Sequence, residues 1–215
     1  MRRNPRLAAL APVPSGFIRA AAMDVETTTP SAGEIEALVR RIDRPLVLVG
    51  MMGVGKSTVG RKLAALLGLA FVDADEEIER AAQMTIQEMF DTHGEPSFRD
   101  GERRVIARLI GDSRGGPRKV LATGGGAFAD PETRALILDR AIAIWLDCDI
   151  DTLFERVSRK SNRPLLREGD PRATLERLRD QRAAAYAEAP IHVVSGRGPH
   201  HSTVLAIVSE LDRWL

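Results

Sequence analysis

Short apolar runs recur along this chain, and each is followed by a stretch with the period of a helix. The runs show little alternation between apolar and polar positions, which is typical of parallel strands buried on both faces. Strands are expected at residues 45–49, 70–73, 120–123, 142–146 and 192–195. Strands that alternate with helices predict an α/β fold of three layers, in which helices flank a five-stranded parallel sheet with right-handed crossovers.

Several helix starts carry capping signals. Residues 31–34 and 85–88 have the spacing of a capping box, and Asp130 is an N-cap residue followed by proline at the first helical position. We expect helices near residues 34–42, 56–67, 75–82, 85–92, 95–112, 131–140, 150–159, 172–188 and 202–214.

The N-terminal residues differ from the rest in composition. Residues 1–22 contain four arginines and no acidic residue, a bias shared with transit peptides. They lack a sustained amphipathic pattern, however, and Met23 offers an alternative first residue. We therefore expect a flexible extension over residues 1–30, followed by one domain over residues 31–215.

The bulk composition excludes several classes of protein. The chain has 215 residues, of which 44% are hydrophobic and 28% charged, as expected for one soluble α/β domain. A net charge of +1 gives no reason to expect a nucleic-acid or membrane surface. The single cysteine, Cys148, cannot form an internal disulfide, which favours a reducing compartment. We expect a cytoplasmic monomer.

Residues 50–58 read GMMGVGKST and follow the first apolar run. Gly50, Gly55, Lys56 and Ser57 satisfy the P-loop pattern G-x-x-x-x-G-K-[ST], and a strand before and a helix after provide the required context. Glycines let successive N–H groups face phosphate oxygens, the lysine reaches the outer phosphates and the serine hydroxyl binds Mg²⁺. A chance glycine-rich turn is the alternative. The residues expected to bind ATP here are Gly53, Val54, Gly55, Lys56, Ser57 and Thr58.

Magnesium also requires a carboxylate, and two places could provide it. Asp73 and Asp75 lie at the end of the second strand, which we expect beside the P-loop strand, whereas Asp147 ends the fourth strand. Asp147 and its acidic neighbours also have the pattern of loop residues that cap the next helix. Because ligands bind at the carboxyl ends of parallel strands, we favour Asp73 and Asp75.

Other residues indicate a small polar phosphoryl acceptor. The chain has no N-K-x-D guanine-reading motif, which argues against a GTPase. Arg99 lies near the start of a long predicted helix, three residues before Glu102. Gly124, Gly125 and Gly126 end the third strand, and without Cβ atoms they allow a ligand to approach the backbone.

Residues 159–172, RKSNRPLLREGDPR, interrupt the alternation of strands and helices. The stretch is polar, rich in arginine and contains two prolines. By itself it has the character of a solvated loop between two helices. Next to a phosphate-binding loop, we interpret it as a mobile basic lid.

Together these motifs resemble the shikimate kinase family of P-loop kinases, over about residues 45–215. The shared features are the P-loop, the D-x-D pair, F-R-x-x-E from Phe98, T-G-G-G, R-P-L-L from Arg163, and R-x-x-x-Y at Arg182 and Tyr186. The resemblance implies an enzyme, a transferase that phosphorylates the 3-hydroxyl of shikimate with ATP and Mg²⁺. The reaction gives shikimate 3-phosphate and ADP, in the pathway to chorismate and the aromatic amino acids.

The resemblance also implies roles on the acceptor side. Asp75 would grip the shikimate hydroxyls and assist loss of the proton. Arg99 and Arg182 would hold the substrate carboxylate, for which bidentate guanidinium pairing is suited. The triple glycine would contact the substrate through its backbone, Gly125 most directly.

On the nucleotide side, the resemblance implies three catalytic residues, Lys56 and Asp75 together with Arg163 from the lid. Arg163 would close on the transferring phosphoryl group and also bind the nucleotide. Asp73 would contact the Mg²⁺ outer shell, beside Ser57. Arg156 and Arg197 would lie near the adenine.

Two alternatives remain at this point. Another small-molecule P-loop kinase, such as a gluconate kinase, would phosphorylate a flexible acid instead of a ring. A nucleotide-binding regulatory module would bind ATP without turnover.

The histidines show no metal-binding pattern, and we interpret all of them as surface residues, at His93, His192, His200 and His201.

Overall fold

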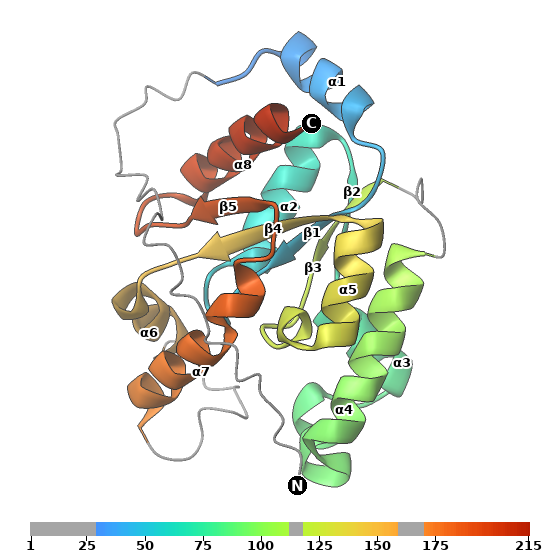
Figure 1. Ribbon diagram of the computed structural model, residues 1–215, viewed down its shortest axis with the longest axis vertical. Helices are drawn as coiled ribbons and strands as arrows, with labels where there is room; N and C mark the ends of the chain where they lie inside the picture. Colours follow the sequence, from blue (N-terminus) through green and yellow to red (C-terminus); the bar gives the residue numbers. More distant parts are fainter. Residues whose placement is uncertain (1–28, 112–117, 159–169) are drawn as a thin grey trace, which may run out of the picture.

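The computed structural model describes residues 29–111, 118–158 and 170–215 (Figure 1). Five parallel strands form one sheet in the order β2-β3-β1-β4-β5. The strands are β1 (Leu46–Val49), β2 (Ala70–Asp73), β3 (Lys119–Ala122), β4 (Ile142–Asp147) and β5 (Ile191–Val194). Fold class and strand positions therefore agree with the sequence prediction, to within one or two residues.

One detail of the sheet differs from the prediction. We expected the strand that ends in Asp73 to lie beside the P-loop strand, but β2 pairs with β3, and β3 pairs with β1. The chain leaves β1, crosses over and forms β2 at the edge of the sheet; β3 then fills the position between them. Because the neighbours of β1 are β3 and β4, the chain after β1 lies at a switch in strand order, where open α/β sheets bind ligands.

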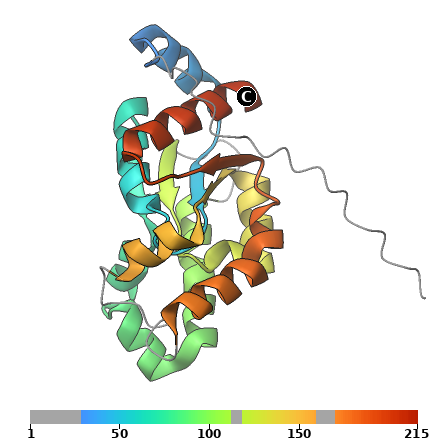
Figure 2. The same cartoon turned by 90° about the vertical axis from the view of Figure 1, so that its left-hand side faces the viewer.

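Helices cover both faces of the sheet. They are α1 (Ala32–Arg41), α2 (Lys56–Leu67), α3 (Ala74–Ala82), α4 (Ile86–Ile110), α5 (Pro131–Arg140), α6 (Ile150–Ser158), α7 (Pro171–Tyr186) and α8 (His200–Trp214), with a 3-10 turn η1 (Ala127–Ala129). Figure 2 shows the sheet between α2 and α8 on one side and α5 and α7 on the other. All four residues of β1 are buried, as the central strand of a three-layer fold requires.

The capping signals act as predicted, and the predicted break within α4 is present. Ser31 and Thr85 form capping boxes with Glu34 and Glu88, and Asp130 caps α5. The two helices expected at residues 85–92 and 95–112 are the two halves of α4, which meet at a break in the helical backbone. Gly94 has φ 75° and ψ 168°, values outside the helical region, which bends the chain there.

Two predictions fall on residues that the structure does not describe. The N-terminal extension lies outside the described residues up to residue 28, and the proposed lid lies outside them over residues 159–169, Arg163 included. The remaining lid residues, 170–172, form the capped start of α7. Among the described helices, none is both long and apolar enough to cross a membrane.

Candidate active site

The P-loop links the carboxyl end of β1 to the start of α2. Gly55, the N-cap of α2, has φ 102°, a left-handed conformation that favours glycine. Lys56 is buried, and its Nζ donates hydrogen bonds to the backbone oxygens of Gly50 and Met51 at 2.8 and 3.0 Å. The ammonium group therefore lies inside the curve of the loop, close to the N-terminus of α2, where phosphate binding is favourable.

A cavity of about 430 Å³ opens over the P-loop. Its polar walls include the side chains of Lys56, Ser57 and Thr58. The Val54 side chain is fully buried, and Val54 is not among the described residues that line the cavity, so its contact with ATP stays a prediction. The described residues around the cavity are Met52, Gly53, Gly55, Lys56, Ser57, Thr58, Asp75, Thr123, Gly125, Arg156, Val157 and His200.

The two arginines expected near adenine occupy different places. Arg156 lines the cavity and donates hydrogen bonds to the backbone oxygens of Val54, at 3.1 Å, and Gly196, at 2.8 Å. Arg197 is not among the described residues of the cavity wall; its Nε donates to Thr152 Oγ1 at 3.3 Å. The geometry therefore places a cation on the cavity wall at position 156 and turns the other toward α6.

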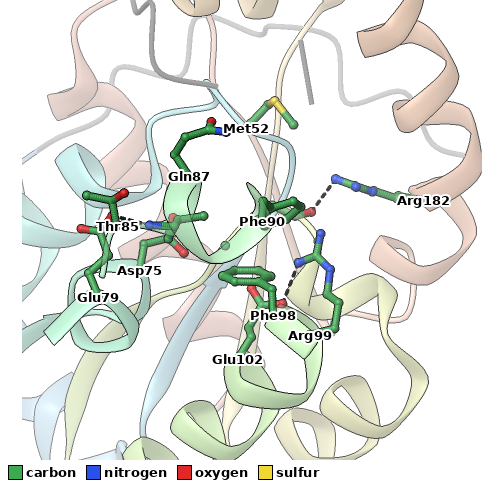
Figure 3. A pocket seen from close by; sticks show the side chains of 14 residues that line it. Met52, Asp75, Glu79, Thr85, Gln87, Phe90, Phe98, Arg99, Glu102 and Arg182 are labelled. Carbon is green, nitrogen blue, oxygen red and sulfur yellow. Dashed lines mark hydrogen bonds and ion pairs between the residues drawn. The ribbon is translucent and has the colours of Figure 1, made fainter. Parts of the chain in front are cut away.

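A second cavity, of about 240 Å³, lies between α3, α4 and the end of β3 (Figure 3). Figure 3 shows Arg99 and Arg182 on one side of it and Asp75 on the other. The described residues around it are Met52, Asp75, Glu79, Thr85, Ile86, Gln87, Phe90, Phe98, Arg99, Glu102, Gly124, Gly125, Gly126 and Arg182. The two predicted guanidinium groups and the predicted carboxylate thus share one cavity.

The two cavities meet at three residues. Met52, Asp75 and Gly125 line both of them. Asp75 therefore stands between the space over the P-loop and the space that holds the two arginines. A carboxylate in this position can accept a proton from a hydroxyl that faces the P-loop.

Arg99 is held by two carboxylates. It donates hydrogen bonds to Glu102 at 2.6 Å and to Glu95 at 2.9 and 3.2 Å. Burial opposes its positive charge, but attraction to Glu102 and Glu95 prevails and raises the pKa of Arg99. The guanidinium carbon of Arg99 also lies over the ring of Phe98, 5.2 Å from the ring centroid, which is within the range of a cation–π contact.

Glu102 is 2% exposed. Burial raises the pKa of this carboxyl, although Arg99 opposes the effect. One oxygen accepts the hydrogen bond from Arg99, and the other, Oε1, has no hydrogen-bond partner among the described residues. The ion pair sets the orientation of Arg99 toward the cavity.

Each glycine of the triple-glycine turn makes room for a different group. A Cβ on Gly124 would lie 2.5 Å from Glu102 Oε1, and one on Gly126 would lie 2.5 Å from an Arg99 nitrogen. A Cβ on Gly125 would lie 3.0 Å from the backbone nitrogen of Met52 in the P-loop. Three elements therefore approach the backbone of this turn closely, and the contact at Gly125 is with backbone, which moves aside less easily than the ends of the Glu102 and Arg99 side chains.

Arg182 and Tyr186 attach helix α7 to the same turn. Arg182 is buried and donates a hydrogen bond to the backbone oxygen of Gly125 at 2.9 Å. The Tyr186 hydroxyl donates to the same oxygen. Burial raises the pKa of Tyr186 to about 12, so the hydroxyl keeps its proton.

The aspartates considered for magnesium have distinct environments. Asp73 caps α3, and its Oδ1 accepts a hydrogen bond from the backbone N–H of Asp75 at 3.1 Å. It is not among the described residues of either cavity wall. Asp147 accepts a hydrogen bond from its neighbour's N–H and lies 3.6 Å from His192, while Asp149 caps the start of α6. Capping at the end of β4 agrees with the sequence interpretation.

The sequence analysis did not predict some of the residues that line the two cavities. His200 was interpreted as a surface residue, but it lines the cavity over the P-loop, and its Nδ1 is buried. Burial, Arg156 and Lys62 lower its pKa. Gln87 was also missed, and Thr123 was included only as part of the T-G-G-G motif, without a role of its own. Thr123 is the residue before the glycines, and its hydroxyl donates a hydrogen bond to the backbone oxygen of Leu48 at 3.1 Å. Its position at the end of a strand could have identified it as a cavity residue.

Comparison with known proteins places this arrangement in context. The family model described as shikimate kinase matches residues 52–212. The shikimate kinase of Novosphingobium aromaticivorans is 64% identical over 193 residues, covering 90% of this chain and 100% of the relative. That of Rhodopseudomonas palustris is 52% identical over 187 residues, covering 87% and 89%. The solved structure of shikimate kinase from Acinetobacter baumannii in complex with shikimate is 35% identical, with a TM-score of 0.74 over 81% of this chain and 95% of that chain.

Proposed function

Because the chain belongs to the shikimate kinase family, we propose that it transfers the γ-phosphoryl group of ATP to the 3-hydroxyl of shikimate where its two cavities meet. The products are shikimate 3-phosphate and ADP. ATP occupies the cavity over the P-loop, and shikimate occupies the cavity between α3, α4 and the triple glycine.

One observation carries the assignment of the acceptor. Arg99 and Arg182 lie on one side of the smaller cavity, and Asp75 lies on the side that opens to the P-loop. A ring acid can pair its carboxylate with the guanidinium groups while a ring hydroxyl faces Asp75. A flexible linear acid such as gluconate gains less from this fixed spacing, because it must lose more conformational freedom to bind.

Asp75 is the proton acceptor in this proposal. The 3-hydroxyl donates a hydrogen bond to the carboxylate, its proton passes to that carboxylate, and the oxygen forms a bond to the γ-phosphorus as the bond to the ADP oxygen breaks. Phosphoryl transfer needs little covalent help from the protein; positioning and charge stabilisation dominate. Lys56 stabilises the charge on the phosphate oxygens from inside the P-loop.

Magnesium is expected with the nucleotide, and the donors present suit it. Ser57 offers a hydroxyl at the start of α2, and Asp75 offers a carboxylate in the wall of the same cavity. Asp73, whose Oδ1 accepts a hydrogen bond from the Asp75 N–H, would act from outside the cavity wall, in the outer shell of the ion. Among the described residues, no group of three or more His, Cys, Asp or Glu side chains could hold a metal alone. When bound, Mg²⁺ neutralises phosphate charge.

Substitution of Asp75 tests the proposal. Asp75→Asn keeps the size of the side chain but removes the proton acceptor, so kcat should fall by about 10² to 10⁴. Shikimate affinity, measured by calorimetry, should change much less. Glu76→Gln is the matched control, since Glu76 forms an exposed ion pair with Arg61. Unchanged kcat in Asp75→Asn would contradict the assignment of the base.

The lid, the oligomeric state and the location complete the proposal. Arg163 is assigned to the transferring phosphoryl group on the sequence motif alone. A cytoplasmic location is supported by the buried free thiol at Cys148, and the monomeric state is carried over from the sequence prediction. Light scattering after gel filtration tests the monomer; a dimer at assay concentration would contradict it.

A further inference from the structure

Gln87 lines the smaller cavity, the one between α3, α4 and the triple glycine, which we call the acceptor cavity. Its side chain has no role in the family resemblance or in the proposed mechanism. It lies in the first turn of α4 and lines the cavity (Figure 3). Its side-chain oxygen, Oε1, is buried, and it accepts no hydrogen bond from the described residues. A buried acceptor without a donor is unfavourable, so such an atom in a ligand cavity indicates a ligand donor.

The orientation of the Gln87 amide follows from its neighbour. Nε2 donates a hydrogen bond to Asp91 Oδ1 at 2.8 Å, one helical turn further along α4. A carboxylate accepts hydrogen bonds, so the NH₂ group must face Asp91, and the amide oxygen must face away from it. The acceptor character of the buried atom is therefore fixed by hydrogen-bond chemistry.

The remaining donors on the substrate are few. The substrate carboxylate is an acceptor, and in the proposed function Arg99 and Arg182 hold it. The 3-hydroxyl donates to Asp75. The hydroxyls at C4 and C5 of the ring remain as donors. We propose that Gln87 Oε1 accepts a hydrogen bond from one of these two hydroxyls and so contributes to selection of the acceptor. This inference rests on the proposed function, which assigns shikimate to this cavity.

Gln87→Met tests the inference, because methionine has a similar length but lacks the amide. The KM for shikimate should rise about three- to tenfold, as expected for one lost neutral hydrogen bond, while kcat and the KM for ATP stay unchanged. Thr92→Ala is the control, since Thr92 is an exposed residue of the same helix half outside the cavity wall. An unchanged KM in both Gln87→Met and Gln87→Ala would overturn the inference.

Substrate analogues separate direct contact from a structural effect. For 4-deoxyshikimate and 5-deoxyshikimate, the wild-type enzyme should lose affinity for both. Gln87→Met should lose no further affinity for the analogue whose missing hydroxyl Gln87 binds. If the loss of affinity from Gln87→Met adds in full to the loss from the missing hydroxyl, for both analogues, a direct contact would be contradicted. Failure of the proposed function would be distinct, since wild-type enzyme would then show no turnover of shikimate itself.

Asp91 provides a second variant. Asp91→Ala removes the group that orients the amide but leaves the amide in place. We expect a smaller rise in the KM for shikimate than in Gln87→Met, because the amide can still turn its oxygen to the substrate. A rise larger than that of Gln87→Met would contradict an orienting role.

Discussion

At the scale of single residues, the acceptor cavity depends on buried charges that approach a glycine turn closely. Arg99 and Glu102 form an ion pair in contact distance of Gly126 and Gly124, and Arg182 is bonded to Gly125. A charged pair that leaves water is stable only when its hydrogen bonds are made. The site is therefore sensitive to small changes at these positions.

Arg99→Ala should mainly affect the acceptor. Loss of charge-assisted hydrogen bonds to the substrate carboxylate should raise the KM for shikimate about 10- to 150-fold, with little change in the KM for ATP. Steady-state kinetics with each substrate varied in turn measures this. Arg104→Ala is the control, because Arg104 lies on the same helix with a 74% exposed side chain. Equal losses for both substrates would contradict a carboxylate clamp.

The buried hydroxyl of Tyr186 predicts how the stability of the fold depends on pH. Burial raises its pKa to about 12, above the ordinary value of 10.0, so its contribution to folding is complete below pH 10 and is lost as pH rises through about 12. The chain has one tyrosine, so the ultraviolet absorbance of tyrosinate reports this residue alone. We expect ionisation near pH 12 or on alkaline unfolding, whichever comes first. Tyrosinate formation near pH 10 in the folded protein would contradict the buried hydroxyl.

Residue types at the site could be predicted where chemistry fixes their spacing. The P-loop pattern, the Asp75 carboxylate and the two arginines were placed by motif, and the structure gathers those it describes around two adjoining cavities. Gln87 and His200 escaped prediction, because a single polar residue at a helix start has no periodic signal. Their burial depends on elements that are remote in sequence.

At the scale of elements, the kink in α4 shapes the acceptor cavity. The half before Gly94 supplies Gln87 and Phe90 to the wall, and the half after it supplies Phe98 and Arg99. A straight helix would present residues on one stripe only. The kink lets one element border the cavity along two directions.

Two glycines of α4 should respond in opposite ways to alanine. Gly94 has φ 75° and ψ 168°, a region open almost to glycine alone, so Gly94→Ala should destabilise the fold by about 1–3 kcal/mol. Gly101 has open space around its Cβ position within the helix, so Gly101→Ala should stabilise by about 0.5–1 kcal/mol. Urea unfolding measures both. Equal effects of the two substitutions would contradict the kink.

Elements were predictable where local chemistry decides them. Capping boxes located the starts of α1 and α4, and short apolar runs located the strands. The order of the strands could not be predicted from local sequence. β3 lies between β1 and β2, and no pattern within β2 indicates this. The break in α4 was predictable as a gap between two helices, because Gly94 and Pro96 interrupt the helical pattern locally.

At the scale of the whole molecule, the sheet brings three segments that are distant in sequence to the carboxyl ends of its strands. The P-loop after β1, the D-x-D pair after β2 and the glycines after β3 all follow the carboxyl ends of parallel strands. Parallel topology therefore places the P-loop, Asp75 and the triple glycine side by side, which are the groups we propose for the phosphoryl donor, the base and the acceptor. The family's activity follows from this arrangement, with Asp75 at the boundary of the two cavities.

The position of phosphate on the product tests this account most directly. The protein is incubated with ATP, Mg²⁺ and shikimate, and phosphorus–proton correlation NMR identifies the phosphorylated oxygen. If Arg99 and Arg182 hold the carboxylate opposite Asp75, as we propose, phosphate should appear on the C3 oxygen alone, and gluconate should not be phosphorylated. Phosphate on the C4 or C5 oxygen, or equal ADP release with and without shikimate, would contradict the arrangement.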